Sequence, residues 1–401
     1  MNWILFLHIY QPPYQEEKFL RKATEESYKV VLDILKGHPK SKVTLNISGS
    51  LIDLLEDFGY QEVLYGFKEL IEKGQVELVG TAKYHPILPL IPEKEVIRQI
   101  KLQEKTLEKY FGDSFKRQGF FIPELAYSKK VAKVIKELGY RWIILDEISH
   151  SGSIGLISFN KKYLIEGLDL QVIFRNRNLS DLFFTPWLKE EEDFFRVRKW
   201  DGRSEKFTVT CCDGENFGHH QKGKEKILID LLEDRRLKTI TCSDYLSLLE
   251  DREYVTPIES SWSSRKDELK SSIPYGLWNY PGNPIHEKLW RLQKIALETR
   301  DQLDSRAQTL LDKALSSDYF WWAGAMPWWH VDIIEQGAEK LYEVVELSSL
   351  DGRAKDQAGL LKEKISKTAR DWHASGKAEK IKRAFFKRED FDCYFGGEKV
   401  S

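Results

Sequence analysis

The sequence predicts an α/β fold in which a closed or nearly closed barrel of strands and helices is followed by a helical region. Short apolar runs alternate with helical stretches up to about residue 250, as expected for a parallel sheet covered by helices. From about residue 285 onward, helical periodicity continues without apolar strands in between. With 401 residues, 41% of them hydrophobic, the chain can bury a large core.

The predicted elements of the first part follow one another closely. The strand-like and helical segments are residues 3–9, 27–38, 42–55, 65–74, 75–87, 95–112, 117–124, 129–139, 140–147, 207–218 and 225–234. Gly37, Gly74, Gly112 and Gly139 close four of the helices. Roughly seven strand and helix pairs can be counted, which suits a barrel. Residues 151–206 are less regular and are predicted to form an insertion over one rim.

Composition narrows the possible partners. Lys and Arg total 62 against 63 for Asp and Glu, and the charges are interspersed, so we expect neither nucleic acid nor a membrane surface as partner. The four cysteines show no metal-ligand spacing and no sign of a disulfide framework. The first apolar run lacks a basic leader and contains His8, which indicates a buried strand and a cytoplasmic protein.

Polar residues follow several predicted strands. In a barrel of this kind, catalytic groups lie at the carboxyl ends of the strands, where loops and side chains converge. The candidates at these ends are His8, Tyr84, His85, Glu124, Asp146, Glu147, Asp213 and Glu215. Two carboxylates on neighbouring strand ends, one nucleophilic and one kept protonated, are what cleavage of a glycosidic bond needs.

Each carboxylate also has a simpler interpretation. Glu124 follows two phenylalanines and an isoleucine, so burial would raise the pKa of its carboxyl, but it could equally cap the helix that begins just after it. Asp213 and Glu215 are two residues apart and would face the same way on extended backbone, with Gly214 allowing close approach of a ligand. A plain Asp-Gly turn after a strand explains the same residues.

Aromatic residues gather in the downstream third. Trp290 lies at helical spacing and is best explained by helix packing, whereas the segment SSDYFWWAGAMPWWH (316–330) is harder to explain as core. Its flat rings beside Asp318 resemble a platform for pyranose faces, with a carboxylate to bind hydroxyl groups.

Five separated motifs give the sequence a resemblance to a known family. They are LHIYQPP (7–13), GQVELVGTAKYHPILPL (74–90), FFIPELAY (120–127), CDGENFG (212–218) and SSWSSRKDELKSSIPYGLWN (260–279). In this order they resemble glycoside hydrolase family 57, which contains α-amylases, amylopullulanases, glucan branching enzymes and 4-α-glucanotransferases. The resemblance spans about residues 1–350, with Tyr10 where the family usually has histidine and Phe121 where some relatives have tryptophan.

The resemblance implies a fold, a mechanism and a site. The fold is an incomplete barrel of seven βα units followed by a helical bundle, and the mechanism is retaining, with Glu124 as nucleophile and Asp213 as general acid and base. Together with the strand-end pattern, it gives the expected substrate-binding residues: His8, Gln11, His85, Phe121, Glu215, Trp262, Asp318 and Trp321. We expect an α-glucan or maltooligosaccharide with α-1,4 linkages as substrate, and no cofactor or metal.

The expected organisation has two domains. Residues 1–280 would form the catalytic barrel, with the insertion near 151–206, and residues 281–401 a helical domain that completes the cleft.

Three alternatives stay open at this point. A 4-α-glucanotransferase or branching enzyme would use the same residues with a sugar acceptor in place of water. A metal-dependent polysaccharide deacetylase would need clustered ligands, but none of the nine histidines has a partner three or four residues along. A non-catalytic glucan-binding protein would keep the cleft without turnover.

Overall fold

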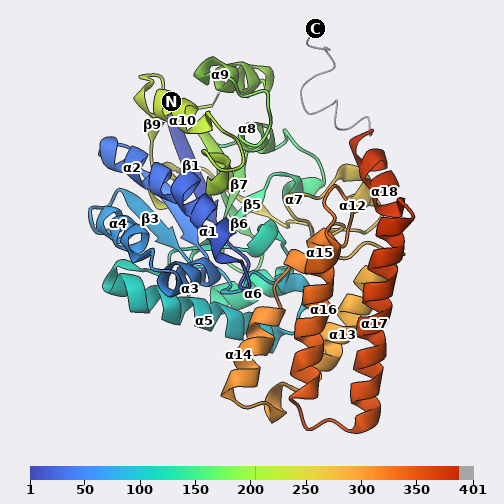
Figure 1. The fold of residues 1–401 in the computed structure, drawn as a ribbon. Helices are drawn as coiled ribbons and strands as arrows, with labels where there is room; N and C mark the ends of the chain where they lie inside the picture. Colours follow the sequence, from blue (N-terminus) through green and yellow to red (C-terminus); the bar gives the residue numbers. More distant parts are fainter. Residues whose placement is uncertain (204, 388–401) are drawn as a thin grey trace. The chain divides into compact units, whose positions relative to one another are not determined.

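The computed structural model describes residues 1–203 and 205–387, so Cys393 and the end of the predicted helical domain (281–401) lie outside this part. The chain divides into two compact units. Unit 1 comprises Met1–Lys83 and Leu88–Lys266, and unit 2 comprises Tyr84–Ile87 and the residues from Asp267 onward. Figure 1 shows both units and labels many of their elements.

Unit 1 has an α/β structure, as predicted. Its strands are β1 (Asn2–Ile9), β2 (Val43–Ile47), β3 (Val76–Val79), β4 (Gly119–Phe121), β5 (Trp142–Asp146), β6 (Lys162–Ile165), β7 (Gln171–Arg175), β8 (Phe207–Asp213), β9 (Lys238–Thr239) and β10 (Arg252–Val255). One sheet has the order β3-β2-β1-β8, with β9 also paired to β1, and the other has the order β10-β6-β7-β5-β4. Of these pairs, β6 with β7 is antiparallel and the others are parallel.

Backbone hydrogen bonds join the two sheets at two places. Beyond the end of β3, the Gly80 N–H donates to the Gly119 oxygen (3.0 Å), and the Phe121 N–H of β4 donates to the Gly80 oxygen (2.8 Å). Just after β7, the Asn176 N–H donates to the Val209 oxygen of β8 (2.8 Å). The carboxyl-terminal parts of β1, β4 and β8 therefore belong to one continuous hydrogen-bonded framework.

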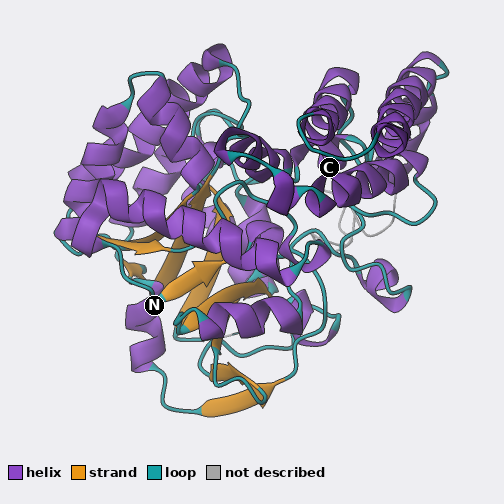
Figure 2. Ribbon diagram, turned by 90° about the horizontal axis from the view of Figure 1, so that it is seen from below, coloured by secondary structure: helices purple, strands orange, loops and turns teal. Residues whose placement is uncertain are grey.

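Helices lie around these strands (Figure 2). They are α1 (Glu17–Ala23), α2 (Lys29–Gly37), α3 (Gly49–Asp57), α4 (Gln61–Glu72), α5 (Glu93–Phe111), α6 (Lys129–Glu137), α7 (Ile148–Ser151), α8 (Arg177–Leu182), α9 (Glu191–Trp200), α10 (Lys224–Glu233) and α11 (Cys242–Leu248). In α2, for example, Val31, Leu32, Ile34 and Leu35 are buried and the remaining face is polar. Because helices cover the sheet, β2 and β5 are buried along their whole length.

The irregular segment 151–206 contains two strands of the second sheet, β6 and β7. Within it, β7 pairs with β5 over five residues and forms an antiparallel pair with β6. The helices α8 and α9 follow. The sequence did not indicate these two strands, because β6 has only 4 residues and β7 only 5.

The described part of unit 2, up to residue 387, is helical apart from its loops. Its helices are α12 (Lys266–Lys270, whose first residue belongs to unit 1), α13 (Pro284–Glu298), α14 (Ser305–Ala314), α15 (Asp318–Trp322), α16 (Val331–Glu346), α17 (Gly352–Ala374) and α18 (Lys377–Phe386). Helix α17 packs against α13 and α16. Apolar residues at helical spacing form this core, among them Leu341 and Val345 of α16 and Leu361 and Ile365 of α17.

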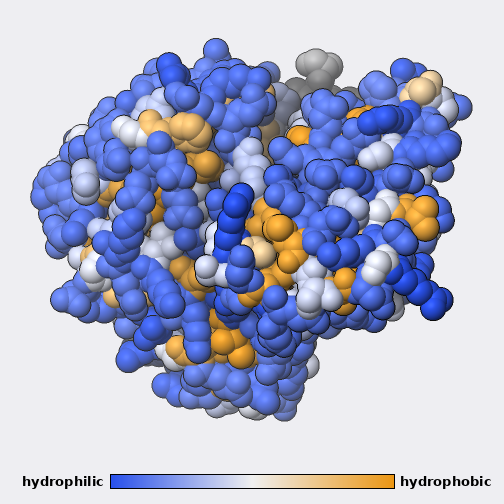
Figure 3. All heavy atoms as spheres, turned by 60° about the horizontal axis from the view of Figure 1, so that its bottom comes forward, coloured by the Kyte–Doolittle hydropathy of each residue, from blue (hydrophilic) through white to orange (hydrophobic). Residues whose placement is uncertain are grey.

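Polar side chains cover most of the face seen in Figure 3, and the apolar ones form scattered groups. No helix in the described part of the chain is long and apolar enough to cross a membrane.

Candidate active site

Glu124 lies in a strained turn just after β4. Its backbone has φ 59° and ψ 15°, a left-handed conformation that is uncommon for residues other than glycine and that often marks functional sites. The helix that follows, α6, has Ser128 as its N-cap, and the Ser128 side chain accepts the Val131 N–H. The alternative interpretation of Glu124 as the cap of this helix is therefore wrong.

Trp262 holds Glu124 by two hydrogen bonds. Its indole Nε1–H donates to Glu124 Oε2 (2.7 Å), and its backbone N–H donates to the Glu124 carbonyl oxygen (3.1 Å). The segment is anchored further along, where the Tyr127 N–H donates to the Ser260 oxygen (2.8 Å). Since a hydrogen bond to a carboxylate is stronger than a neutral one, Trp262 fixes the orientation of the Glu124 carboxyl group.

Aromatic rings line the same place. The His8 ring stacks on Phe121 with centroids 4.2 Å apart, and the Trp262 ring approaches both edge-on, at 5.9 Å from Phe121 and 6.2 Å from His8. His8 Nδ1 is 2.7 Å from Asn46 Oδ1. Burial lowers the pKa of His8 to about 4, although the Asn46 contact acts in the opposite direction. The imidazole is therefore neutral at pH 7.

Asp213 is the last residue of β8 and is the register partner of His8 on β1. Burial raises the pKa of its carboxyl to about 6; the charge of Arg175 lowers it and that of Asp181 raises it further. Its side chain keeps part of its surface exposed to solvent. A carboxyl group with this pKa can both give and take a proton near neutral pH.

Glu215 anchors the loop after β1. The strand β8 ends at Asp213 and Gly214–Asn216 form a 3-10 turn, so the expectation that Asp213 and Glu215 share extended backbone is wrong. Glu215 Oε1 accepts the Tyr10 N–H (3.0 Å) and the Tyr28 hydroxyl (2.6 Å). Burial, and then the charge of Asp213, raise the pKa of Glu215 to about 8, so it is mostly protonated at pH 7.

Gln11 and Gly214 belong to the same arrangement. The Gln11 side chain donates to the Tyr28 hydroxyl (2.9 Å) and accepts from Gln15 (2.8 Å). A Cβ at Gly214 would lie 2.5 Å from Ile9, so glycine lets the turn pack directly on β1. Gly214 was expected to allow close approach of a ligand, but here it allows close packing on Ile9 of β1.

Three other predicted residues lie in unit 2. His85, with φ 56°, is buried, and its Nδ1 lies 3.3 Å from Ser317 Oγ. Asp318 begins α15 and accepts the Ser316 hydroxyl. The Trp321 ring is half-exposed and lies 5.6 Å from the ring of Trp328. Within unit 2, His85 and Asp318 thus contact the two serines that precede α15, Ser317 and Ser316.

Sequence reasoning missed a buried ionic cluster in unit 1. Arg175 Nε lies 2.6 Å from Asp146 Oδ2, and Arg177 Nη2 lies 2.7 Å from Asp146 Oδ1. Arg175 Nη2 also pairs with Asp181 (2.9 Å). Its Nη1 donates to the carbonyl oxygen of Cys211 on β8 (3.0 Å). The signals in the sequence were Asp146 at a strand end and, much further along the chain, the pattern RNRN (175–178).

Comparison with known proteins identifies the family. The family model described as glycosyl hydrolase family 57 matches residues 3–258, well over half of the chain. The chain belongs to glycosyl hydrolase family 57. The resemblance noted from the five motifs is thereby confirmed.

Two curated relatives of this family 57 chain carry different names. An "Alpha-amylase" of Pyrococcus horikoshii is 28% identical over 366 residues, which cover 80% of this chain and 56% of the relative. A "4-alpha-glucanotransferase" of Thermococcus litoralis is 25% identical over 366 residues, covering 80% of this chain and 54% of the relative. The chain thus spans about half the length of these curated relatives.

Solved structures share the family fold. The 4-α-glucanotransferase from Thermococcus litoralis superimposes with a TM-score of 0.67 at 20% identity, covering 86% of this chain and 59% of the other. A family 57 branching enzyme from Thermococcus kodakaraensis gives 0.63 at 17% identity, covering 90% and 94%. At these identities the likeness concerns the fold alone.

The family match includes Glu124 and Asp213 but ends before Trp262. The position of Trp262 beside Glu124 therefore comes from the structure of this chain and not from the family match.

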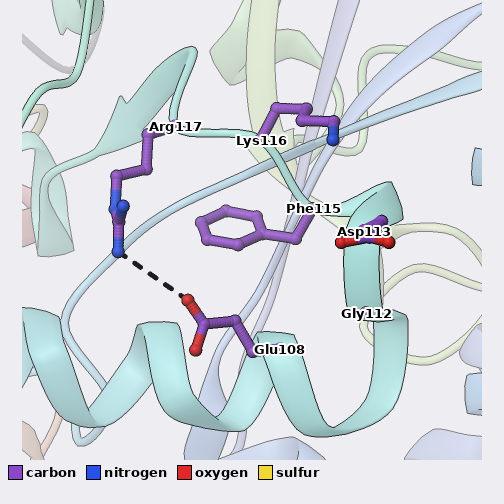
Figure 4. Close-up of a pocket in the computed structure, with 6 residues that line it drawn as sticks. All are labelled: Glu108, Gly112, Asp113, Phe115, Lys116 and Arg117. Carbon is purple, nitrogen blue, oxygen red and sulfur yellow. Dashed lines mark ion pairs between the residues drawn. The ribbon is translucent and has the colours of Figure 1, made fainter.

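An exposed pocket at the end of α5 contains none of the predicted site residues (Figure 4). Its lining residues are Glu108, Gly112, Asp113, Phe115, Lys116 and Arg117, and Arg117 Nη2 lies 3.7 Å from Glu108 Oε1. Over residues 1–203 and 205–387, no three His, Cys, Asp or Glu side chains are grouped so that they would hold a metal ion.

Proposed function

We propose that this chain is a retaining glycoside hydrolase that cleaves α-1,4-linked glucans by double displacement. One observation carries the proposal: the Trp262 indole fixes the Glu124 carboxylate beside the His8–Phe121 stack, and Asp213, with a pKa of about 6, ends β8, the strand next to β1. A fixed carboxylate and a carboxyl group with a raised pKa are the two components that this reaction needs.

In the proposed mechanism, Glu124 attacks the anomeric carbon while Asp213 gives its proton to the leaving glycosidic oxygen. The first product leaves, and a glucosyl ester on Glu124 remains. Asp213, now ionised, takes a proton from water, which attacks the same carbon and releases Glu124. Two inversions at one carbon retain the anomeric configuration.

The surroundings suit an uncharged sugar. His8 is neutral at pH 7 because it is buried, and Glu215 is mostly protonated. Of the three rings beside Glu124, His8 and Phe121 are buried and Trp262 is half-buried, and none of them brings a net charge to the site. We assign Trp262 a contact with a sugar ring in addition to its role toward Glu124. Phe121, expected from the sequence to bind substrate, is fully buried and would support the rings of His8 and Trp262 instead.

The proposal includes the architecture and location expected from the sequence. Strands β1, β2, β3, β4, β5, β7 and β8 would form the incomplete seven-stranded barrel, which the hydrogen bonds at Gly80 and Asn176 support. Residues 1–280 would be the catalytic domain, and 281–401 the helical bundle that contributes to the cleft. Cys211, Cys212 and Cys242 are free thiols, which favours the cytoplasm.

A second candidate is 4-α-glucanotransferase activity. It is favoured by the match to a relative of that name over 80% of this chain. The same two carboxylates would act, but the hydroxyl of a second sugar chain would replace water in the second displacement.

Product analysis from maltoheptaose tests the proposal. Wild type would be compared with Glu124→Gln, Asp213→Asn and the control Glu137→Gln, which changes a surface carboxylate of α6. We expect shorter maltooligosaccharides from wild type and the control, and none from the two site variants.

Other product patterns would point elsewhere. Products longer than maltoheptaose would establish a transferase. Binding of glucan without any cleavage would favour the non-catalytic protein, and release of acetate from acetylated glycans would favour the deacetylase.

A further inference from the structure

Arg175, the last residue of β7, places a charged group at the centre of unit 1. It is 3% exposed, and its guanidinium is bound on three sides. Nε contacts Asp146 (2.6 Å), Nη2 contacts Asp181 (2.9 Å) and Nη1 donates to the Cys211 carbonyl oxygen (3.0 Å). These bonds hold the plane of the guanidinium in one orientation.

The same guanidinium reaches the residue that holds Glu124. Arg175 Nη2 lies 3.5 Å from the Trp262 carbonyl oxygen, and the guanidinium carbon lies 5.4 Å from the centroid of the Trp262 ring. This distance is within the range of a cation–π interaction, which strengthens in desolvated surroundings. Arg175 therefore acts on the Glu124 carboxylate indirectly, through its contacts with Trp262.

Arg175 also contacts the strand that carries Asp213. Cys211, whose carbonyl oxygen it binds, precedes Asp213 by two residues on β8. We infer that Arg175 is a positioning residue that fixes Trp262 against Glu124 and the end of β8 that carries Asp213, so that one side chain orients both carboxylates. The inference rests on the proposed function for its kinetic consequences.

The chemistry of the contacts requires arginine. Lysine has one charged nitrogen, which cannot reach Asp146, Asp181 and the Cys211 oxygen in three directions or present a flat face to an indole ring. Arg175→Lys would keep the charge and lose part of the positioning.

The test combines kinetics with a direct observation of Trp262. Full-length wild type is compared with Arg175→Met, Arg175→Lys and the control Arg203→Met, which removes another largely buried guanidinium, paired with Glu147 and Asp201. The double variant Arg175→Met/Asp181→Asn removes the acid that would otherwise lose its partner. The indole ¹H–¹⁵N signal of Trp262 is assigned with Trp262→Phe, and kcat and KM are measured on maltoheptaose.

We expect Arg175→Met to move the Trp262 indole signal and to lower kcat by about tenfold or more, with KM changed less than about twofold. Arg175→Lys should recover part of kcat, and Arg203→Met should leave the indole signal in place. If Arg175→Met does not fold, the same measurements are made on the double variant, and the same results are expected.

An unmoved Trp262 indole signal in a folded Arg175 variant would overturn the inference, as would a kcat equal to that of Arg203→Met. If wild type cleaves no α-glucan, the proposed function fails. The indole signal then still decides whether Arg175 positions Trp262, because that readout needs no turnover.

Discussion

Trp262→Phe removes one hydrogen bond from the candidate active site and keeps an aromatic ring in place. The lost bond joins the indole Nε1–H to Glu124 Oε2 at 2.7 Å. A hydrogen bond to a charged group contributes about 1.5–3 kcal/mol, and about 1.4 kcal/mol corresponds to tenfold in rate. If the bond holds Glu124 for attack, kcat should fall by roughly 10- to 150-fold while KM changes little.

The assay is steady-state hydrolysis of maltoheptaose, together with thermal unfolding. Trp142→Phe is the matched control, because Trp142 is a buried tryptophan of β5 whose Nε1–H donates to Ser243 Oγ at 3.2 Å. Both variants keep a benzene ring and lose the pyrrole ring with its N–H, so both proteins should lose stability. Only Trp262→Phe should have a lower kcat. A Trp262→Phe enzyme with a kcat within twofold of the control would refute the positioning role.

Three further predictions concern neighbouring residues. Activity of wild type should decline as the pH rises above about 6, since Asp213 must carry a proton to act as an acid, and a flat rate from pH 5 to 8 would contradict this assignment. The folded-state pKa of Glu215, about 8, exceeds its ordinary 4.5, so the folded chain holds an extra proton between these values and loses stability as the pH rises through them. Glu215→Gln should therefore gain roughly 2 to 4 kcal/mol over wild type between pH 5 and pH 8. The same difference in urea unfolding midpoint between the two proteins at both pH values would contradict this prediction. Ser128→Ala should cost about 1 kcal/mol of stability through the lost N-cap of α6 with kcat unchanged, and a large loss of kcat would show that the cap also positions Glu124.

The sequence predicted the carboxyl ends of β1, β4 and β8 well. Each strand is buried and mainly apolar with a polar side chain at or near its end, and such a pattern can be recognised from local composition. His8 and Asp213 are register partners and Glu124 follows β4, at the strand ends where the pattern placed them.

The positions of other residues depend on distant parts of the chain. Arg175 and Trp262 are 87 residues apart, and no spacing rule connects them. The turn that contains Glu215 depends on the packing of Gly214 on Ile9, a residue of another strand. A prediction from the sequence around Glu215 alone could not foresee this contact. The role of Ser128 as helix cap was equally missed, because Glu124 offered a carboxylate at almost the same place.

Trapping the covalent intermediate tests the proposed mechanism most directly. Wild type would be incubated with a 5-fluoro-α-glucosyl fluoride, which forms the glucosyl ester faster than water releases it, and the labelled peptide would be located by mass spectrometry. We predict a single fluoroglucosyl group on Glu124 and none on the Glu124→Gln protein. A label on Asp213 or Glu215, or an active enzyme that hydrolyses maltoheptaose with inversion and takes up no label, would contradict the role of Glu124 as nucleophile.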